Sequence, residues 1–120
     1  MKKANPLKDK SFEFAVRIVK AYQFLISDKK EYVMSKQLLR SATAIGAIYR
    51  EAEYAESKID FIHKLAISQK EANETLYWLE LLSKTQYLSL SQFESLYQDG
   101  EELLKLITSI IKTTKLNINN

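Results

Sequence analysis

The side chains that could bind a metal or transfer protons are few and belong to one expected helix. Asp60 and His63 form a single Asp-x-x-His motif, and the chain has no second histidine and no cysteine. A di-iron carboxylate site in a helical bundle needs two Glu-x-x-His motifs and two further glutamates. Glu71 and Glu74 share a helical face and could act as an acid–base pair, although ion pairing is the commoner role of such residues. We therefore predict no catalytic, metal-binding or cofactor-binding residues and expect a protein that is not an enzyme.

Bulk composition is that of an ordinary globular protein. The chain has 120 residues, of which 46% are hydrophobic and 28% are charged, and this is enough for one domain with a real core. Without cysteine it has no disulfide, thiol nucleophile or zinc–cysteine site. The N-terminal sequence lacks an apolar signal segment, and no run approaches the length of a membrane span. We expect a cytoplasmic protein with no membrane partner.

The scarcity of turn residues predicts an all-α fold. Gly46, Gly100 and Pro6 are the only glycines and the only proline, fewer than sheet proteins need at their turns. The expected helices cover about Asp9–Ser27, about Ser35–Tyr54, the residues after the N-cap Ser57, and the residues after a Ser91–Glu94 capping box. Short connections indicate an antiparallel, up-down-up-down four-helix bundle. It forms one domain over residues 1–120, with the bundle at about 9–113 and frayed termini.

Helical spacing assigns one core-facing stripe to each expected helix. The predicted core positions are Phe12, Ala15, Ile18, Val19, Tyr22, Leu25 and Ile26; Leu38, Ala42, Ile45, Tyr49 and Ala52; Phe61, Leu65, Ala72, Leu76 and Leu79; and Phe93, Tyr97, Gly100, Leu104, Ile107 and Ile111. Gly46 lies in the middle of the second helix, where glycine costs up to about 1 kcal/mol relative to alanine. With Ala42, Ala44 and Ala47 it forms a small-residue face that lets another helix approach closely.

The third expected helix carries a second apolar stripe, opposite its core stripe. Burying the roughly 150–250 Å² of Trp78 there could stabilise an assembly by about 4–6 kcal/mol. We expect this face to meet an outer face of the first helix in another subunit, with Arg17 or Arg40 pairing with Glu71 or Glu74. The predicted oligomer interface consists of Phe14, Arg17, Phe24, Ile67, Glu71, Glu74, Trp78 and Leu81. The alternative is an indole that covers loops of its own bundle.

Positive charge is concentrated in the first third of the chain. Residues 1–40 hold ten Lys or Arg against four Asp or Glu, whereas residues 41–120 hold eight against eleven. An antiparallel bundle is expected to bring both termini to one end, where lysines could contact the phosphates of RNA or DNA. The predicted nucleic-acid-binding residues are Lys2, Lys3, Lys8, Lys10, Lys112 and Lys115. The alternative is that these lysines only solubilise the surface, since the same end is expected to carry Glu51, Glu53, Glu56 and Asp60.

Several segments of the second and third expected helices together resemble a known family. They are QLLRSATAIG (residues 37–46), REA (50–52), SKIDFIHKL (57–65) and QKEANETLYWL (69–79). The chain resembles the bacterial four-helix-bundle family named for proteins encoded in intervening sequences of 23S ribosomal RNA genes. The accessory variability determinant of diversity-generating retroelements is similar to that family. The likeness extends over about residues 9–113.

This resemblance implies a ring-like homopentamer of antiparallel bundles. For the retroelement branch it also implies a basic surface that binds a reverse transcriptase and nucleic acid. Ile48-Tyr49 departs from the Asn-Ile pair expected of the family, and a net charge of +3 is low for that branch. The family-like positions, none of which implies catalysis, are Arg40, Ser41, Ile45, Glu51, Ala52, Asp60, Phe61, Leu65, Glu71, Glu74 and Leu79.

Three functions are consistent with the sequence. The first is a homo-oligomeric, pentameric scaffold or adaptor that binds RNA or DNA through lysines near its termini. The second is a protein–protein interaction module with no nucleic-acid role, and a salt-dependent gel shift separates these two. The third is an enzyme or metal site built from carboxylates shared between subunits, which a metal analysis of the purified oligomer tests. The physiological partner and the gene context are not encoded in the sequence.

Overall fold

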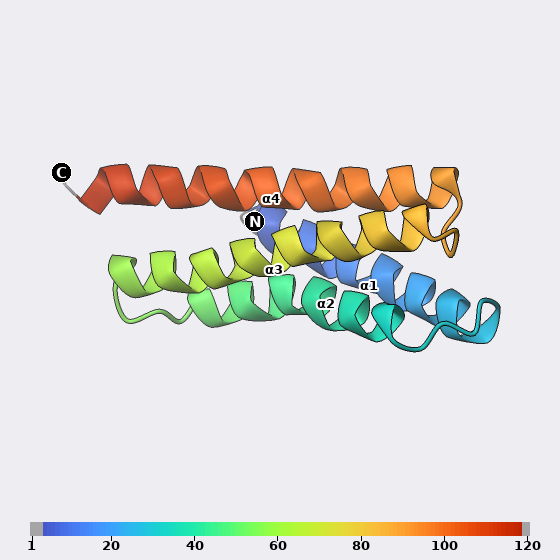
Figure 1. Ribbon diagram of the computed structural model, residues 1–120. Coiled ribbons are helices and arrows are strands. Elements are labelled where there is room, and N and C mark those ends of the chain that lie inside the picture. Colours follow the sequence, from blue (N-terminus) through green and yellow to red (C-terminus); the bar gives the residue numbers. More distant parts are fainter. Residues whose placement is uncertain (1–3, 119–120) are drawn as a thin grey trace.

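The computed structural model describes residues 4–118, which form four helices connected by short loops. They are α1 (Pro6–Ser27), α2 (Met34–Ala52), α3 (Lys58–Lys84) and α4 (Leu90–Ile118). Successive helices run in opposite directions, and α3 lies in front of α1 in the view of Figure 1. Backbones approach closely between α1 and α2, α2 and α3, α3 and α4, and α4 and α1, whereas within the described residues no Cα atoms of a diagonal pair of helices lie within 8 Å of each other. The predicted all-α, antiparallel four-helix bundle is therefore confirmed.

The starts of α1 and α3 are fixed by side chains that accept hydrogen bonds from first-turn N–H groups. Asn5 accepts from the Lys8 N–H (3.2 Å), and Pro6 suits the first helical position because it has no N–H to satisfy. Ser57 accepts from the Asp60 N–H (3.0 Å), which confirms it as the N-cap of α3. None of the described helices combines the length and the apolar character needed to span a bilayer.

The start of α4 is also capped, but not where the sequence predicts. The Ser89 hydroxyl accepts from the Gln92 N–H (3.1 Å), and the Gln92 side chain accepts from the Ser89 N–H (2.9 Å). This reciprocal pair is a capping box, and it lies two residues before the predicted Ser91–Glu94 box. Both pairs have the required spacing, and the buried Leu88 anchors the loop so that Ser89 occupies the cap position.

At its other end α3 stops in a Schellman motif whose left-handed position is occupied by Gln86. The backbone φ of Gln86 is 69°. Its N–H donates to the Ser83 carbonyl oxygen (3.0 Å), and the Tyr87 N–H donates to the Leu82 carbonyl oxygen (2.9 Å). These two bonds define the motif, in which glycine is the usual occupant because it has no Cβ.

Replacing Gln86 with glycine is expected to raise the free energy of unfolding by about 0.5–1 kcal/mol, because the left-handed conformation disfavours a Cβ. The matched control is Gln98→Gly, at an exposed glutamine inside α4. This substitution should lower the free energy of unfolding by about 1 kcal/mol. Urea unfolding followed by circular dichroism measures both changes. A loss of stability in Gln86→Gly would show that the glutamine side chain itself supports the turn.

The core consists of one buried stripe from each helix. Its hydrophobic members are Leu7, Phe14, Ile18 and Leu25 of α1; Leu38, Ala42, Ile45, Tyr49 and Ala52 of α2; Leu65, Ala72, Leu76, Leu79 and Leu82 of α3; Leu88; and Leu96, Leu103, Ile107 and Ile111 of α4. The stripes predicted for α2 and α3 are confirmed, except that Phe61 is half-buried. In α4 the buried stripe is shifted in part, with Leu103 inside and Leu104 half-buried.

The core stripe predicted for α1 is only partly right: Ile18 and Leu25 are buried as predicted, but Phe12 and Val19 are exposed. Phe14 is only 2% exposed and belongs to the core, whereas Phe12 is 57% exposed. Two stripes on this helix, offset by one or two residues, are both apolar, so spacing alone cannot separate them. The close packing of α2 decides between them: a Cβ on Gly46 would lie 2.9 Å from the Ser11 Oγ. Ser11 therefore faces α2 at close range, which confirms the close approach predicted at Gly46 and turns Phe12 outwards.

Helix α4 extends well beyond the N-terminal end of α1. Lys10 forms an ion pair with Glu102, and this register places Pro6 level with Leu106. The later turns of α4 therefore have no α1 beside them, as Figure 1 shows. The tail that was predicted to fray is helical as far as Ile118.

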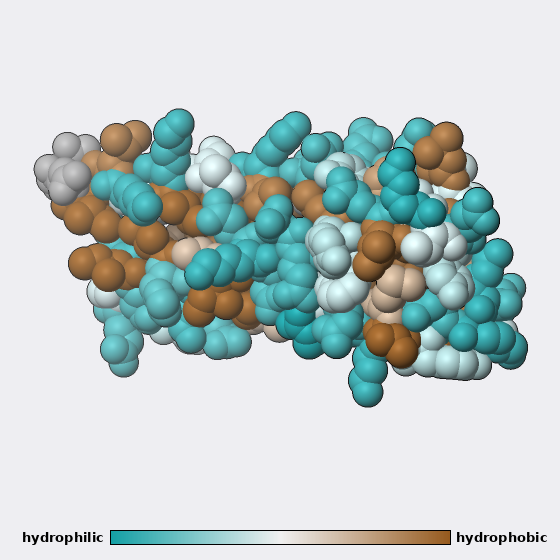
Figure 2. All heavy atoms as spheres, viewed as in Figure 1, coloured by the Kyte–Doolittle hydropathy of each residue, from teal (hydrophilic) through white to brown (hydrophobic). Residues whose placement is uncertain are grey.

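Hydrophobic side chains gather where these last turns of α4 lie beside the first turns of α3, at one end of the surface in Figure 2. Gln69 donates to the Thr108 hydroxyl (2.8 Å), and the same antiparallel register brings Ile59 level with Ile118. We call this surface the end patch. Its members are the exposed Ile59, Leu116 and Ile118 and the half-buried Ile62, Leu106 and Ile110.

Candidate interaction surfaces

The side chains with catalytic potential do not converge on one point. His63 is exposed, and the Asp60 carboxylate accepts from the Glu56 N–H (3.1 Å) at the start of α3. Among residues 4–118, no three His, Cys, Asp or Glu side chains lie close enough together to hold a metal ion. The distinctive arrangements of this part of the chain are on its outer faces.

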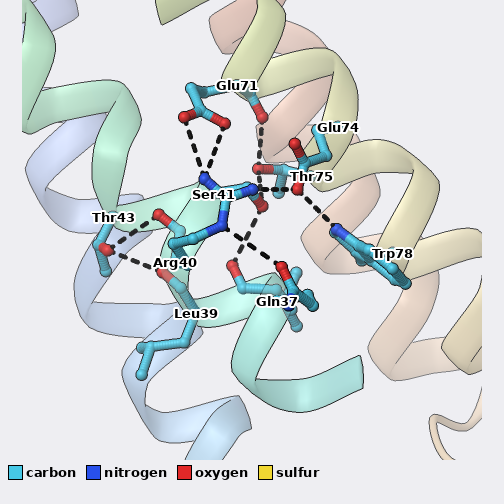
Figure 3. Close-up of polar contacts among 10 residues, drawn as sticks. Gln37, Leu39, Arg40, Ser41, Thr43, Glu71, Glu74, Thr75 and Trp78 are labelled. Atoms are coloured by element: carbon cyan, nitrogen blue, oxygen red, sulfur yellow. Dashed lines mark hydrogen bonds and ion pairs between the residues drawn. The ribbon is translucent and has the colours of Figure 1, made fainter. Parts of the chain in front are cut away.

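An ionic network joins α2 to α3 on one of these faces. Arg40 reaches across from α2, and its Nη1 donates to both carboxylate oxygens of Glu71 at 3.3 and 3.2 Å. Its Nη2 forms a short ion pair with Glu74 one turn further along α3. Figure 3 shows the guanidinium between the two carboxylates. Arg40 therefore pairs with these glutamates within one chain, whereas the sequence predicts such a pairing between subunits.

The same network fixes the indole of Trp78. Its Nε1 donates to the Glu74 Oε2 at 2.9 Å, so one carboxylate oxygen serves both Trp78 and Arg40 (Figure 3). The indole N–H is the largest influence on the Glu74 carboxyl and lowers its pKa; burial opposes this, and Arg40 lowers the pKa further. The carboxylate thus stays ionised, which suits a fixed polar element at the edge of an apolar surface.

The second apolar stripe of α3 is only partly covered by its own chain. Ile67, Trp78 and Leu81 are half-buried, and Trp78 packs against the core cluster. Tyr77 is 54% exposed and touches Trp78 edge-on, with ring centroids 5.0 Å apart. These four residues, which we call the α3 outer face, retain apolar surface that a partner can bury.

On α1 the predicted interface residues have other roles. Phe14 cannot reach another subunit, because it is enclosed in the core of its own bundle. Arg17 forms an ion pair with Asp99 of the same chain and donates to the Ser95 Oγ at 2.7 Å. Phe24 is half-buried and packs against the core cluster. The prediction that Phe14 belongs to an outer face is wrong, because α1 is rotated so that Phe14 faces the core and Phe12 faces outwards.

The apolar residues that α1 does expose form a different stripe, which the sequence pattern had assigned to the core or passed over. Phe12, Val16 and Val19 are all exposed and lie three or four residues apart on one helical face. Arg50 of α2 covers part of Phe12, with its guanidinium carbon 5.5 Å from the ring centroid. We call these three residues the α1 stripe. The sequence feature that could have revealed this exposed stripe is that α1 is apolar on two adjacent faces.

The six lysines predicted to bind nucleic acid are not brought together as one free cluster. Lys8 pairs with Glu53 (3.3 Å), and Lys10 pairs with Glu102. Lys112 and Lys115 are exposed and form no ion pair with another described residue, but they lie on the part of α4 that extends past α1. Lys2 and Lys3 lie outside the described residues.

Two comparisons with known proteins agree with this architecture. The family described as "23S rRNA-intervening sequence protein" matches residues 3–109. A crystal structure from Bacteroides thetaiotaomicron VPI-5482, described as a protein with unknown function from the S23 ribosomal protein family, is 61% identical. The match covers 88% of this chain and 98% of that one, with a TM-score of 0.87. No curated protein matches. Since the family match spans most of its length, the chain belongs to the 23S rRNA-intervening sequence protein family.

Proposed function

We propose that the protein is a non-enzymatic scaffold whose copies associate head to tail into a closed ring. The observation that carries the proposal is the position of its two apolar surfaces. The α1 stripe and the α3 outer face lie on two helices that are not neighbours in the bundle, and each surface borders α2: Arg50 lies over Phe12, and Arg40 pairs with Glu74 beside Trp78. Docking one on the other in the next copy makes a heterologous contact, which forms a ring when the rotation closes. A ring of five agrees with the family resemblance.

The dimensions and chemistry of these faces support such a contact. The molecule measures 52 × 30 × 22 Å, so a long side can supply the roughly 800 Å² per partner that stable interfaces bury. Phe12, Tyr77 and Trp78 provide aromatic surface, which is enriched at interface centres. Arg40 and Glu74 flank the α3 outer face as a polar rim that is already paired.

Val16→Asp is expected to dissociate the oligomer, because it places an unpaired charge in the centre of the apolar contact, and Trp78→Ala is expected to weaken it. Light scattering or native mass spectrometry of the wild type should give a multiple of the 13.9 kDa subunit mass. Gln98→Asp, at an exposed position of α4, is the control and should leave the mass unchanged. A wild-type monomer at micromolar concentration would contradict the proposal.

Binding of RNA or DNA by the terminal lysines is the second candidate, and one observation favours it. In the described part of the chain, Lys112 and Lys115 are exposed and carry no ion pair, so a ring would repeat these charges around its circumference. The pairing of Lys8 and Lys10 with glutamates counts against a larger cluster. A gel shift that is present at low salt, falls steeply with salt and is lost in Lys112→Glu/Lys115→Glu would support this role.

A further inference from the structure

A groove runs between the C-terminal half of α1 and the loop that leads into α4. It consists of two adjoining hollows of about 770 and 420 Å³, open to solvent, which share Phe24, Leu88 and Gln92 as lining residues. One hollow continues along the α3–α4 loop to Lys84, and the other continues along α1 to Arg17. Because they share these residues, the two hollows adjoin each other, at the end of the bundle opposite the end patch.

The groove is lined by positive charge alone. Lys29 and Lys84 line the first hollow, Arg17 and Lys20 line the second, and no Asp or Glu lines either one. Arg17 is already paired with Asp99. The three lysines are exposed and form no ion pair with any residue of the range 4–118. About three uncompensated charges therefore border the two adjoining hollows, and they favour an anionic occupant.

The floor of the groove is aliphatic and not suited to base stacking. Leu88 and Leu96 are buried in it, and Leu90 is 67% exposed at its rim. Phe24 is the only aromatic residue of the lining, and the Lys29 Nζ lies 5.9 Å from its ring centroid. Single-stranded nucleic acids bind to free aromatic faces beside a basic track. A peptide in which aliphatic side chains alternate with carboxylates fits this lining better than a single-stranded nucleic acid does.

We propose that this groove binds an acidic, leucine-rich peptide segment of a partner protein, with carboxylates on Lys20, Lys29 and Lys84 and aliphatic side chains against Leu88 and Leu90. This inference deepens the proposed scaffold function, because it assigns the surface on which the scaffold holds its client. The groove is formed by one chain, so it exists whether or not the ring forms.

The test uses a fluorescent peptide of glutamates and leucines and a second peptide with glutamine in place of every glutamate. Fluorescence anisotropy on the full-length protein should show binding of the acidic peptide that weakens with salt, and much weaker binding of the glutamine peptide. In Lys29→Glu/Lys84→Glu the affinity should fall by about tenfold or more, since two attractive contacts become repulsive. Leu90→Asn should weaken binding without any change of lysine charge.

The control variant is Lys58→Glu/Lys105→Glu, at two exposed lysines that line neither hollow, and it has the same net charge as the groove variant. Lys58 and Lys84 are at opposite ends of the 27-residue α3, about 39 Å apart, so the control should bind the acidic peptide like the wild type. The proposal would be overturned if the control variant lost as much affinity for the acidic peptide as the groove variant does. It would also be overturned if the wild type bound the glutamine peptide as tightly as the acidic peptide. The proposal would also be overturned if a single-stranded oligonucleotide bound more tightly than the acidic peptide and Lys29→Glu/Lys84→Glu abolished that binding.

Light scattering on the same variants separates this inference from the scaffold function. If Lys29→Glu/Lys84→Glu keeps the wild-type mass and loses the peptide, the groove is a client site on an intact assembly. If it instead becomes monomeric, the groove is a contact between copies and the client proposal fails. A wild-type monomer that still binds the peptide would refute the ring and leave the groove assignment standing.

Discussion

Glu31→Ala is expected to lower the free energy of unfolding by about 2–4 kcal/mol, because it leaves a helix N-terminus without its hydrogen-bond acceptor. The Oε1 of Glu31 accepts from the N–H groups of Val33 (3.0 Å) and Met34 (2.9 Å), and its Oε2 accepts from the Ser35 N–H (2.6 Å). Glu31 is only 7% exposed. One carboxylate thus satisfies the donors that open α2, where the helix dipole also favours negative charge.

A graded series separates the role of the charge from that of the acceptor. Glu31→Gln retains one side-chain oxygen and should lose about half as much stability as Glu31→Ala. Asp28→Ala removes an exposed carboxylate from the same loop and should change the free energy of unfolding by no more than about 0.5 kcal/mol. Urea unfolding by circular dichroism gives all three values. Equal effects of Glu31→Ala and Asp28→Ala would show that water replaces the carboxylate without cost.

The contribution of Glu31 should depend on pH in a defined direction. Burial is the largest influence on its pKa and raises it, but the N–H groups of Ser35, Met34 and Val33 and the Ser35 hydroxyl together lower it below the ordinary value of 4.5. A carboxyl with a lower pKa in the folded chain contributes stability that is fully present above its unfolded pKa and is lost as pH falls through the folded pKa. The advantage of the wild type over Glu31→Gln should therefore be constant near neutral pH and shrink below about pH 4.5.

The sequence predicts the helices of this fold and most of the core stripes of α2 and α3, even though α3 carries a second apolar stripe on its opposite side. On α1 the prediction is right for Ile18 and Leu25 but wrong for Phe12, because Phe12 and Phe14 are equally apolar and the choice between them is made by the contact of Ser11 with Gly46. No periodicity within α1 contains that information, since it depends on how closely α2 approaches. The outward position of Phe12 follows from this contact, and so does the α1 stripe.

Candidate surfaces are harder to predict because they join segments that are distant in the chain. Lys29 and Lys84 share a groove only because the loops after α1 and α3 meet at one end of an antiparallel bundle. The importance of Glu31 was likewise hidden in a polar loop, although an acidic residue just before a helix is a recognisable capping signal. Sequence patterns indicated Arg17 or Arg40 as the partner of Glu71 or Glu74, and in the structure Arg40 pairs with both glutamates. They could not tell whether the network lies inside one subunit, because that depends on the distance between α2 and α3.

Gly46→Leu is expected to lower the free energy of unfolding by about 3 kcal/mol or more, because it forces α1 away from α2. Even a single Cβ at this position would lie 2.9 Å from the Ser11 Oγ and 3.3 Å from the Ser11 Cβ. Ser11 is buried, and its hydroxyl donates to the Lys8 carbonyl oxygen (3.1 Å), so it has little room to move aside. Ala47→Leu is the matched control: this position is adjacent and exposed, and its substitution should change stability by less than about 0.5 kcal/mol.

A double-mutant cycle assigns the effect of Gly46 to its contact with Ser11. Gly46→Ala gains up to about 1 kcal/mol of helix propensity, which offsets the cost of the new contact with Ser11. Its net effect on the free energy of unfolding therefore does not by itself reveal that contact. Ser11→Ala removes the hydroxyl that the new methyl group would strike first. The two substitutions together should therefore be more stable than the sum of their separate effects predicts, by at least about 0.5–1 kcal/mol, as measured by urea unfolding. Strict additivity would mean that α1 and α2 can separate slightly without cost, and the packing argument that turns Phe12 outwards and creates the α1 stripe would then fail.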